Sequence, residues 1–114
     1  MPHMHISERR VGDVTILTLK GRLVLEEGDA PLREHIDALI REGRVAIVLN
    51  AHDVTYMDSC GIGALVAKYV SLRQRGGSLK LVSPSRRFQH LLDVTHLVSV
   101  FDTYDSEEAA VESR

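Results

Sequence analysis

The sequence lacks the features of secreted, membrane-spanning and nucleic-acid-binding proteins. It has one cysteine, Cys60, which excludes an internal disulfide and favours a reducing compartment, so we expect a cytoplasmic protein. No apolar run approaches the ~20 residues of a membrane span, and the first residues do not have the charged-then-apolar layout of a signal peptide. With 14 basic against 16 acidic residues, the chain also lacks the basic excess that is usual in nucleic-acid-binding proteins.

Patterns of metal ligands are scarce as well. His3 and His5 lie together near the N-terminus, but no other ligand-type spacing stands near them, so we predict no metal site and no cofactor. What the chain does have is 114 residues, 44% of them apolar and 26% charged, which is the size and composition of one compact domain. We therefore expect residues 1–114 to form a single domain.

Short apolar segments rich in β-branched residues predict the strands. They cover residues 5–9, 14–19, 45–49, 79–82 and 97–101. Gly12 and Asp13 predict a hairpin turn between the first two segments, and Gly21 is expected to end the second. The segments 14–19 and 45–49 are almost continuously apolar, which is typical of strands that are buried on both faces.

Capping residues and helical spacing predict the helices. Asp29 begins the first helix, and Gly43 ends it. The second, before Gly76, has the clearest pattern, with apolar residues at i, i+3, i+4, i+7 and i+8 from Ile62. A third follows 83–85 with Phe88, Leu91 and Leu92 on its inner side, and a fourth begins at Ser106.

The alternation of strands and helices implies parallel strands joined by right-handed crossovers. We therefore predict an α/β fold. It should contain a mixed, mostly parallel sheet of four or five strands, with an antiparallel hairpin at the N-terminus, and three or four helices packed on the sheet.

The chemically informative stretch is 50–63, which we expect to be a polar loop between a buried strand and the strongest helix. In open α/β sheets, sites form at the carboxyl ends of strands, and the unpaired N–H groups of a helix start favour an anion. Ser59 lies at or just before that helix start. From the residues alone, Ser59 is either an N-cap or the functional residue of this site, and Asp58 is likewise a candidate capping or turn residue.

Enzymatic interpretations of this stretch fail on spacing. Gly61-Ile62-Gly63 lacks the third glycine of a dinucleotide fingerprint, because Val66 stands there. Ser59 lacks the glycine two residues earlier that a hydrolase nucleophile elbow requires, and nothing local orients His52 or His90 as its base.

Two further features of the stretch concern packing. Cys60 has no second cysteine or basic cluster beside it, so we expect a small buried packing residue rather than a reactive thiol. Gly61 and Gly63 are unusual in a helical pattern and indicate close backbone approach at the helix start.

The segment 54–65, Val-Thr-Tyr-Met-Asp-Ser-Cys-Gly-Ile-Gly-Ala-Leu, resembles the signature of STAS domains, the anti-sigma factor antagonists. Their pattern is an apolar pair, then Asp-Ser-Ser/Thr-Gly, then a helix. The resemblance extends over nearly the whole chain, since other blocks are also similar to the family. These blocks are 17–23, 83–84, 94–97 and 104–110.

The resemblance implies a regulatory function in a bacterial cell. In the family, the serine after the aspartate is phosphorylated by an anti-sigma factor that is also an ATP-dependent kinase, and a phosphatase reverses this step. Here that serine is Ser59. The domain itself is a binder and a substrate, not an enzyme, with no nucleic-acid partner and no membrane insertion. The residues expected at the partner surface are Asp58, Ser59, Cys60, Gly61, Leu23 and Val24.

Departures from the family pattern keep a second function open. Cys60 stands where Ser or Thr is usual, Val24 stands where an acidic or amide residue is frequent, and His96 stands where a glycine is frequent. The change at Val24 favours the alternative of a scaffold STAS subunit in a signalling assembly or a membrane transporter complex. A small hydrolase using Ser59 or Cys60 ranks third.

Overall fold

The computed structural model describes residues 4–23, 29–95 and 101–113. They form one mixed sheet in the order β1-β2-β3-β4-β5, in which β1 and β2 are antiparallel and the other neighbours are parallel. The strands are β1 (His5–Val11), β2 (Val14–Leu23), β3 (Ala46–Met57), β4 (Ser78–Val82) and β5 (Asp102–Tyr104). The predicted α/β fold with an antiparallel N-terminal hairpin is confirmed.

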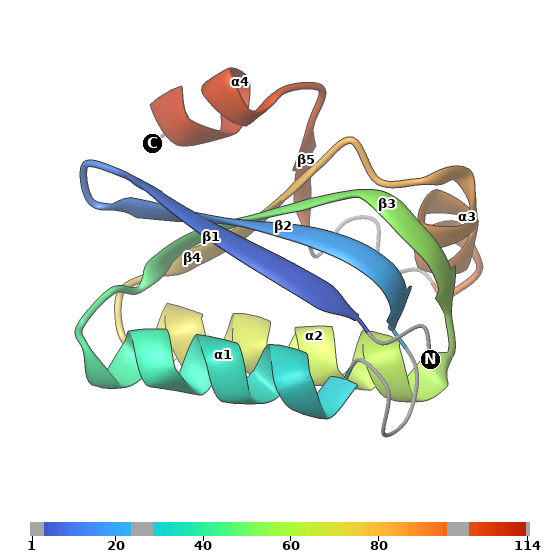
Figure 1. Ribbon diagram of the computed structural model, residues 1–114, viewed down its shortest axis with the longest axis horizontal. Helices are drawn as coiled ribbons and strands as arrows, with labels where there is room; N and C mark the ends of the chain where they lie inside the picture. The colour runs from blue at the N-terminus through green and yellow to red at the C-terminus, as the bar shows by residue number, and fades with distance from the viewer. Residues whose placement is uncertain (1–3, 24–28, 96–100, 114) are drawn as a thin grey trace.

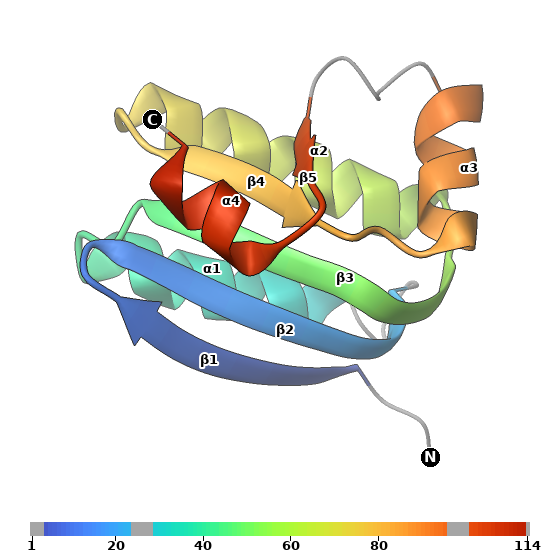
Figure 2. The same ribbon diagram turned by 90° about the horizontal axis from the view of Figure 1, so that it is seen from above.

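The helices cover the two faces of the sheet unequally. Helices α1 (Asp29–Arg41) and α2 (Ser59–Gln74) lie side by side under one face (Figure 1). The short α4 (Glu107–Glu112) lies on the opposite face, and α3 (Arg86–Val94) stands beside the far end of β3 (Figure 2). No helix in the described ranges is long and apolar enough to cross a membrane.

Apolar side chains on both faces of the sheet form two cores. The larger core lies between the sheet and α1, α2 and α3, and includes Leu17, Leu49, Leu65 and Phe88, none of which has exposed surface. The smaller one lies under α4 and consists of Ile16, Val48, Val82 and Ala110. Adjacent residues of β2 and β3 thus point into different cores, which explains why both strands read as continuous apolar runs.

The turns follow the glycines where the sequence predicts them. Gly12 has φ +61° in the hairpin between β1 and β2, and Gly43 has φ +80° just after α1. These are left-handed conformations that glycine adopts without the steric penalty of a Cβ atom. The predicted hairpin turn and the predicted end of the first helix are therefore confirmed.

The strands β2 and β3 run further than predicted. Strand β2 continues through Gly21 to Leu23, and β3 continues through the predicted polar loop to Met57. The two extensions pair with one another, up to Leu23 opposite Met57, with two register shifts on the way. These shifts break the strict alternation of apolar and polar residues, so the sequence of this part resembles a loop.

The last strand was predicted too early. Strand β5 is Asp102–Tyr104, and Phe101 lies in a bend before it; residues 97–100 of the predicted strand lie outside the described residues. Strand β5 is short and polar and pairs with β4 from Lys80 opposite Asp102 to Val82 opposite Tyr104. A three-residue strand without apolar alternation leaves no periodic signal in the sequence.

Candidate functional site

The site begins where β3 ends and α2 starts. Asp58 has an extended backbone, and its Oδ1 accepts a hydrogen bond of 3.0 Å from the backbone N–H of Gly61. Its carbonyl accepts the first helical bond, from the N–H of Ile62 at 3.1 Å. Asp58 is therefore the N-cap, and the interpretation of Ser59 as the cap is wrong.

Ser59 is the first helical residue of α2, and it is exposed. Within the described ranges, its hydroxyl forms no hydrogen bond, so the surrounding fold does not depend on it. The backbone N–H groups of this first turn have no intrahelical acceptors, and the dipole of the 16-residue α2 places its positive end here. Ser59 therefore presents a nucleophilic hydroxyl to solvent beside a region that favours an anion.

Gly61 fixes the start of α2 against the end of β2. A Cβ atom on Gly61 would lie 2.2 Å from the carbonyl oxygen of Leu23, so only glycine fits without movement of the backbone. The N–H of Asp58 also donates to that carbonyl oxygen, at 3.4 Å. The close approach predicted for Gly61 is confirmed. Around Gly63 no described neighbouring element comes within 4 Å of an added Cβ, so for Gly63 approach to a neighbouring element is ruled out and approach to a partner stays a prediction.

Two of the predicted partner-binding residues point inward. The side chain of Leu23 has no exposed surface and belongs to the larger core, and Gly61 is buried against it. Their role in this structure is to support the start of α2, which corrects the prediction that they form the partner surface. The predicted contact residue Val24 lies outside the described residues.

Cys60 is exposed, so the expectation of a buried packing cysteine is wrong. As the second helical residue, it shares the outer surface of the first turn with Ser59, whereas Gly61 and Ile62 carry the buried side. In the described part of the chain, neither residue has a hydrogen bond to His52 or His90, and no group of three metal-ligating side chains occurs. Among the described residues, neither histidine is therefore positioned as a base for Ser59 or Cys60.

An exposed aromatic residue close to the site was not singled out from the sequence. Tyr56 precedes the cap by two residues and is 39% exposed, and the guanidinium carbon of Arg22 lies 5.4 Å from its ring centroid. The two residues are opposite one another in the β2–β3 register, which places a cation over the ring. Only the strand register, which sequence periodicity did not show, reveals this pair.

The exposed side of α2 continues away from Ser59 with small and apolar residues. Gly63 and Ala67 follow at steps of one helical turn, and Val70 is 46% exposed. Together with Tyr56 and Cys60, they add small and apolar groups to a surface that also carries the charges of Asp58 and Arg22. A surface of this kind suits contact with another protein more than capture of a charged small molecule.

The chain matches the STAS domain family model over residues 5–110. It is 36% identical to the anti-sigma-B factor antagonist of Bacillus subtilis over 81 residues, which cover 71% of this chain and 73% of that protein. A crystal structure of a putative anti-sigma factor antagonist from Thermotoga maritima superposes with a TM-score of 0.87 at 29% identity, covering 94% and 92% of the two chains.

Two structures of the Bacillus anti-sigma factor antagonist SpoIIAA share the fold at 22% identity. Its unphosphorylated form has a TM-score of 0.80 and covers 95% of this chain and 94% of its own, and its phosphorylated form has a TM-score of 0.75 with 96% and 100% covered. The sheet order, the capped start of α2 and these similarities agree, and the chain belongs to the STAS domain family.

Proposed function

We propose that this chain is an anti-sigma factor antagonist that binds an anti-sigma factor with serine kinase activity, and that phosphorylation of Ser59 ends the binding. The observation that carries this proposal is the exposed Ser59 hydroxyl in the first turn of α2, which the fold leaves unused. The curated relatives named as antagonists support the general role, and the kinase and a phosphatase that reverses its action belong to the proposal.

Phosphorylation at Ser59 changes the surface without breaking the bonds that hold the helix start. The cap from Asp58 to Gly61 and the contact of Gly61 with Leu23 do not use the Ser59 side chain. A phosphoserine adds about −1.5 to −2 charges at neutral pH, and the N-terminus of a helix tolerates an anion. The fold of SpoIIAA, which has been solved in both phosphorylation states, supports this view.

The added charge acts on the docked partner. The partner surface in this proposal comprises the exposed Ser59 and Cys60, the half-buried Asp58, and their neighbour Tyr56. Asp58 is already acidic, so a phosphate beside it concentrates negative charge where the partner must exclude water. Like charges brought together at an interface cost several kcal/mol, and ~3 kcal/mol corresponds to more than a hundredfold in affinity.

The test is a binding titration with the anti-sigma factor from the same genome, performed with the wild-type chain and with Ser59→Ala and Ser59→Asp variants. We expect Ser59→Ala to bind, and Ser59→Asp to bind at least tenfold more weakly, since one charge reproduces part of the phosphate effect. Ser7→Asp adds the same charge at an exposed position on β1 and serves as the matched control.

Incubation with the partner and ATP, followed by mass spectrometry, tests the covalent step. We expect one phosphate, on Ser59, and none on Ser59→Ala. Undiminished binding of Ser59→Asp, or a phosphate on another residue, contradicts the proposal. Binding of this anti-sigma factor without any phosphorylation indicates an antagonist that is not switched at Ser59, and the absence of binding directs attention to the scaffold subunit alternative.

A further inference from the structure

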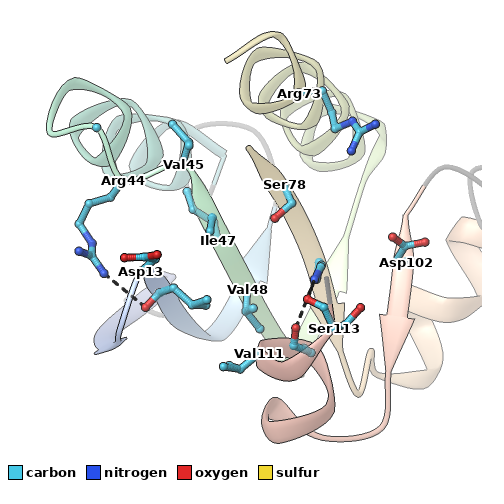
Figure 3. Close-up of a pocket in the computed structure, with 15 residues that line it drawn as sticks. Asp13, Arg44, Val45, Ile47, Val48, Arg73, Ser78, Asp102, Val111 and Ser113 are labelled. Carbon is cyan, nitrogen blue, oxygen red and sulfur yellow. Dashed lines mark hydrogen bonds between the residues drawn. The ribbon is translucent and has the colours of Figure 1, made fainter. Parts of the chain in front are cut away.

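A cavity of about 620 Å³ opens at the end of the sheet opposite to Ser59. It lies between the first residues of β3 and β4, the hairpin after β1, the last turn of α2, and α4 (Figure 3). Strand β3 begins in this cavity and ends at the cap of α2, and α2 begins at Ser59 and returns to the cavity at Arg73. The cavity and the proposed switch residue therefore occupy opposite ends of the same two elements.

Three cationic side chains line this cavity: Arg44, Arg73 and Lys80. Arg44 donates its hydrogen bonds to neutral oxygens. Its Nε donates to Thr15 Oγ1 at 2.8 Å, and its terminal nitrogen donates to backbone carbonyls of the hairpin. Lys80 Nζ donates to the carbonyl oxygens of Ala110 and Ser113, at 3.3 and 2.6 Å. Among residues 4–23, 29–95 and 101–113, no carboxylate forms an ion pair with any of the three.

Each of these cations keeps donors that a ligand can use. An arginine has five N–H donors and a lysine ammonium has three, so the bonds just described leave donors on Arg44 and one on Lys80, whose ammonium also lies 5.7 Å from the Tyr104 ring centroid. Arg73 is exposed, and in the described part of the chain its side chain has no hydrogen bond. The neutral partners hold Arg44 and Lys80 in place without cancelling their positive charge.

The rest of the lining is apolar, acidic or, at Ser78 and Ser113, polar and uncharged. The apolar lining is divided between the two faces of the sheet, with Val48 and Val111 on the side of the smaller core and Val45 and Ile47 packed with the larger one. The exposed Asp13 and Asp102 contribute two carboxylates. In Figure 3, Asp13 lies near the hairpin and Asp102 lies on β5, on opposite sides of the cavity. The three cations exceed the two carboxylates, so the lining has a net positive charge.

We propose that this cavity binds a small phosphomonoester, with the phosphate at its cationic side chains and the organic part against Val48 and Val111. The volume lies within the range of small-molecule sites, roughly 300–1,000 Å³. A phosphomonoester is close to a dianion at neutral pH, which matches several cations better than a carboxylate does, and charge-assisted hydrogen bonds are the stronger class. This site is separate from the proposed partner surface at Ser59.

The test is an NMR titration of the ¹⁵N-labelled chain with phenyl phosphate at constant ionic strength, with phenol and benzoate as the neutral and monoanionic comparisons. We expect saturable shifts of the backbone amides of Arg44, Ser78 and Lys80, weaker binding of benzoate, and no binding of phenol. Arg73→Ala should weaken phenyl phosphate binding about tenfold, because one charge-assisted contact is lost. Arg75→Ala, also exposed at the end of α2 but outside the cavity, should not.

Three results would overturn this site. They are shifts that grow linearly without saturation, shifts centred on the first turn of α2, and equal loss of affinity in Arg73→Ala and Arg75→Ala. The Ser59→Asp variant separates this proposal from the preceding one, because it should bind phenyl phosphate as the wild type does, whatever its effect on the anti-sigma factor.

Discussion

Among the described residues, the larger core of twenty buried side chains lies on the face of the sheet that packs against α1 and α2, whereas on the other face the six-residue α4 covers a cluster of four. What α4 lacks in apolar area, it partly replaces with polar contacts. Glu107 binds Arg9 and Asn50, and Lys80 holds the last carbonyls of α4. Full burial of a large aliphatic side chain contributes about 1.5–3 kcal/mol, and a typical hydrogen bond about 1 kcal/mol.

Because of this difference, we expect the packing on the two faces of the sheet to be lost under different conditions. The face under α1 and α2 should respond to the size of side chains, and it should unfold with the whole domain. The face under α4 should respond to pH and to the loss of single polar groups, and it should open locally. The following experiments test this contrast.

The largest effect is expected for Leu65→Ala, which removes a fully buried side chain of α2 from the larger core. Truncation of such a leucine lowers the free energy of unfolding by about 2–5 kcal/mol, because the transfer free energy of the removed methyl groups is lost and a cavity is left. Urea unfolding should measure this loss in the free energy of unfolding. Val70→Ala on the exposed side of the same helix should stay within about 0.5 kcal/mol, and equal losses in both variants would contradict the assignment of the two sides.

Gly61→Ala comes next. Its methyl group would meet the Leu23 carbonyl oxygen, a backbone atom that cannot rotate away, so we expect a loss of about 1–3 kcal/mol. Gly63→Ala is the matched control, since no atom lies near its added methyl group, and the better helix propensity of alanine should raise stability by up to ~1 kcal/mol. In urea unfolding, we expect the free energy of unfolding to fall for Gly61→Ala and to rise for Gly63→Ala. Losses of equal size would show that the contact of Gly61 with Leu23 does not require glycine.

Lys80→Met tests the polar attachment of α4. The variant keeps most of the side-chain length but loses the donors to Ala110 and Ser113, so we expect a loss of about 1 kcal/mol. Hydrogen exchange of the α4 amides should become faster while the amides of α2 change little. Lys68→Met, which removes the 2.7 Å ion pair with Asp37 between α1 and α2, should leave α4 exchange unchanged.

The smallest effect on stability is expected when acid pH protonates Glu107. The hydrogen bond from Asn50 and the neighbouring Arg9 hold the pKa of Glu107 below its ordinary value of 4.5. Because the pKa is lower in the folded state, the stabilisation is present above about pH 4.5 and is lost as the pH falls through the folded pKa. We expect a change of about 0.2–1 kcal/mol.

The measurement should be local, because Glu8 also has a lowered pKa, caused mainly by its hydrogen bond with His35 of α1. The backbone amide signals of Ala109 and Ala110 report on α4. In the wild-type chain they should shift with pH below 4.5, and in Glu107→Gln this pH-dependent shift should be smaller. An unchanged pH response in Glu107→Gln would assign the effect to another group.

The sequence predicted those parts of the fold that local pattern determines. Continuous apolar runs identified β2 and β3, and apolar spacing from Ile62 identified α2. The prediction was wrong where pairing with a distant strand determines the bounds of a strand. The extension of β3 to Met57 depends on pairing with β2 across two register shifts, and the short β5 depends on its pairing with β4.

The candidate site was found in outline, and its details required coordinates. Asp58 and Ser59 are both good capping residues, so propensity does not distinguish which of them caps α2. Whether Cys60 faces out and Leu23 faces in depends on the helix phase and on the path of β2. A residue's preference for burial is an average over proteins, and the first turn of a helix is too short to impose its own pattern.

The contact between Gly61 and the Leu23 carbonyl has a consequence for how this domain can diversify. The support of the first turn of α2 uses a main-chain oxygen and a residue without a side chain, so it places no demand on the identity of the two outward residues, Ser59 and Cys60. Substitutions at these positions can therefore redirect recognition toward a different protein while the scaffold beneath stays the same.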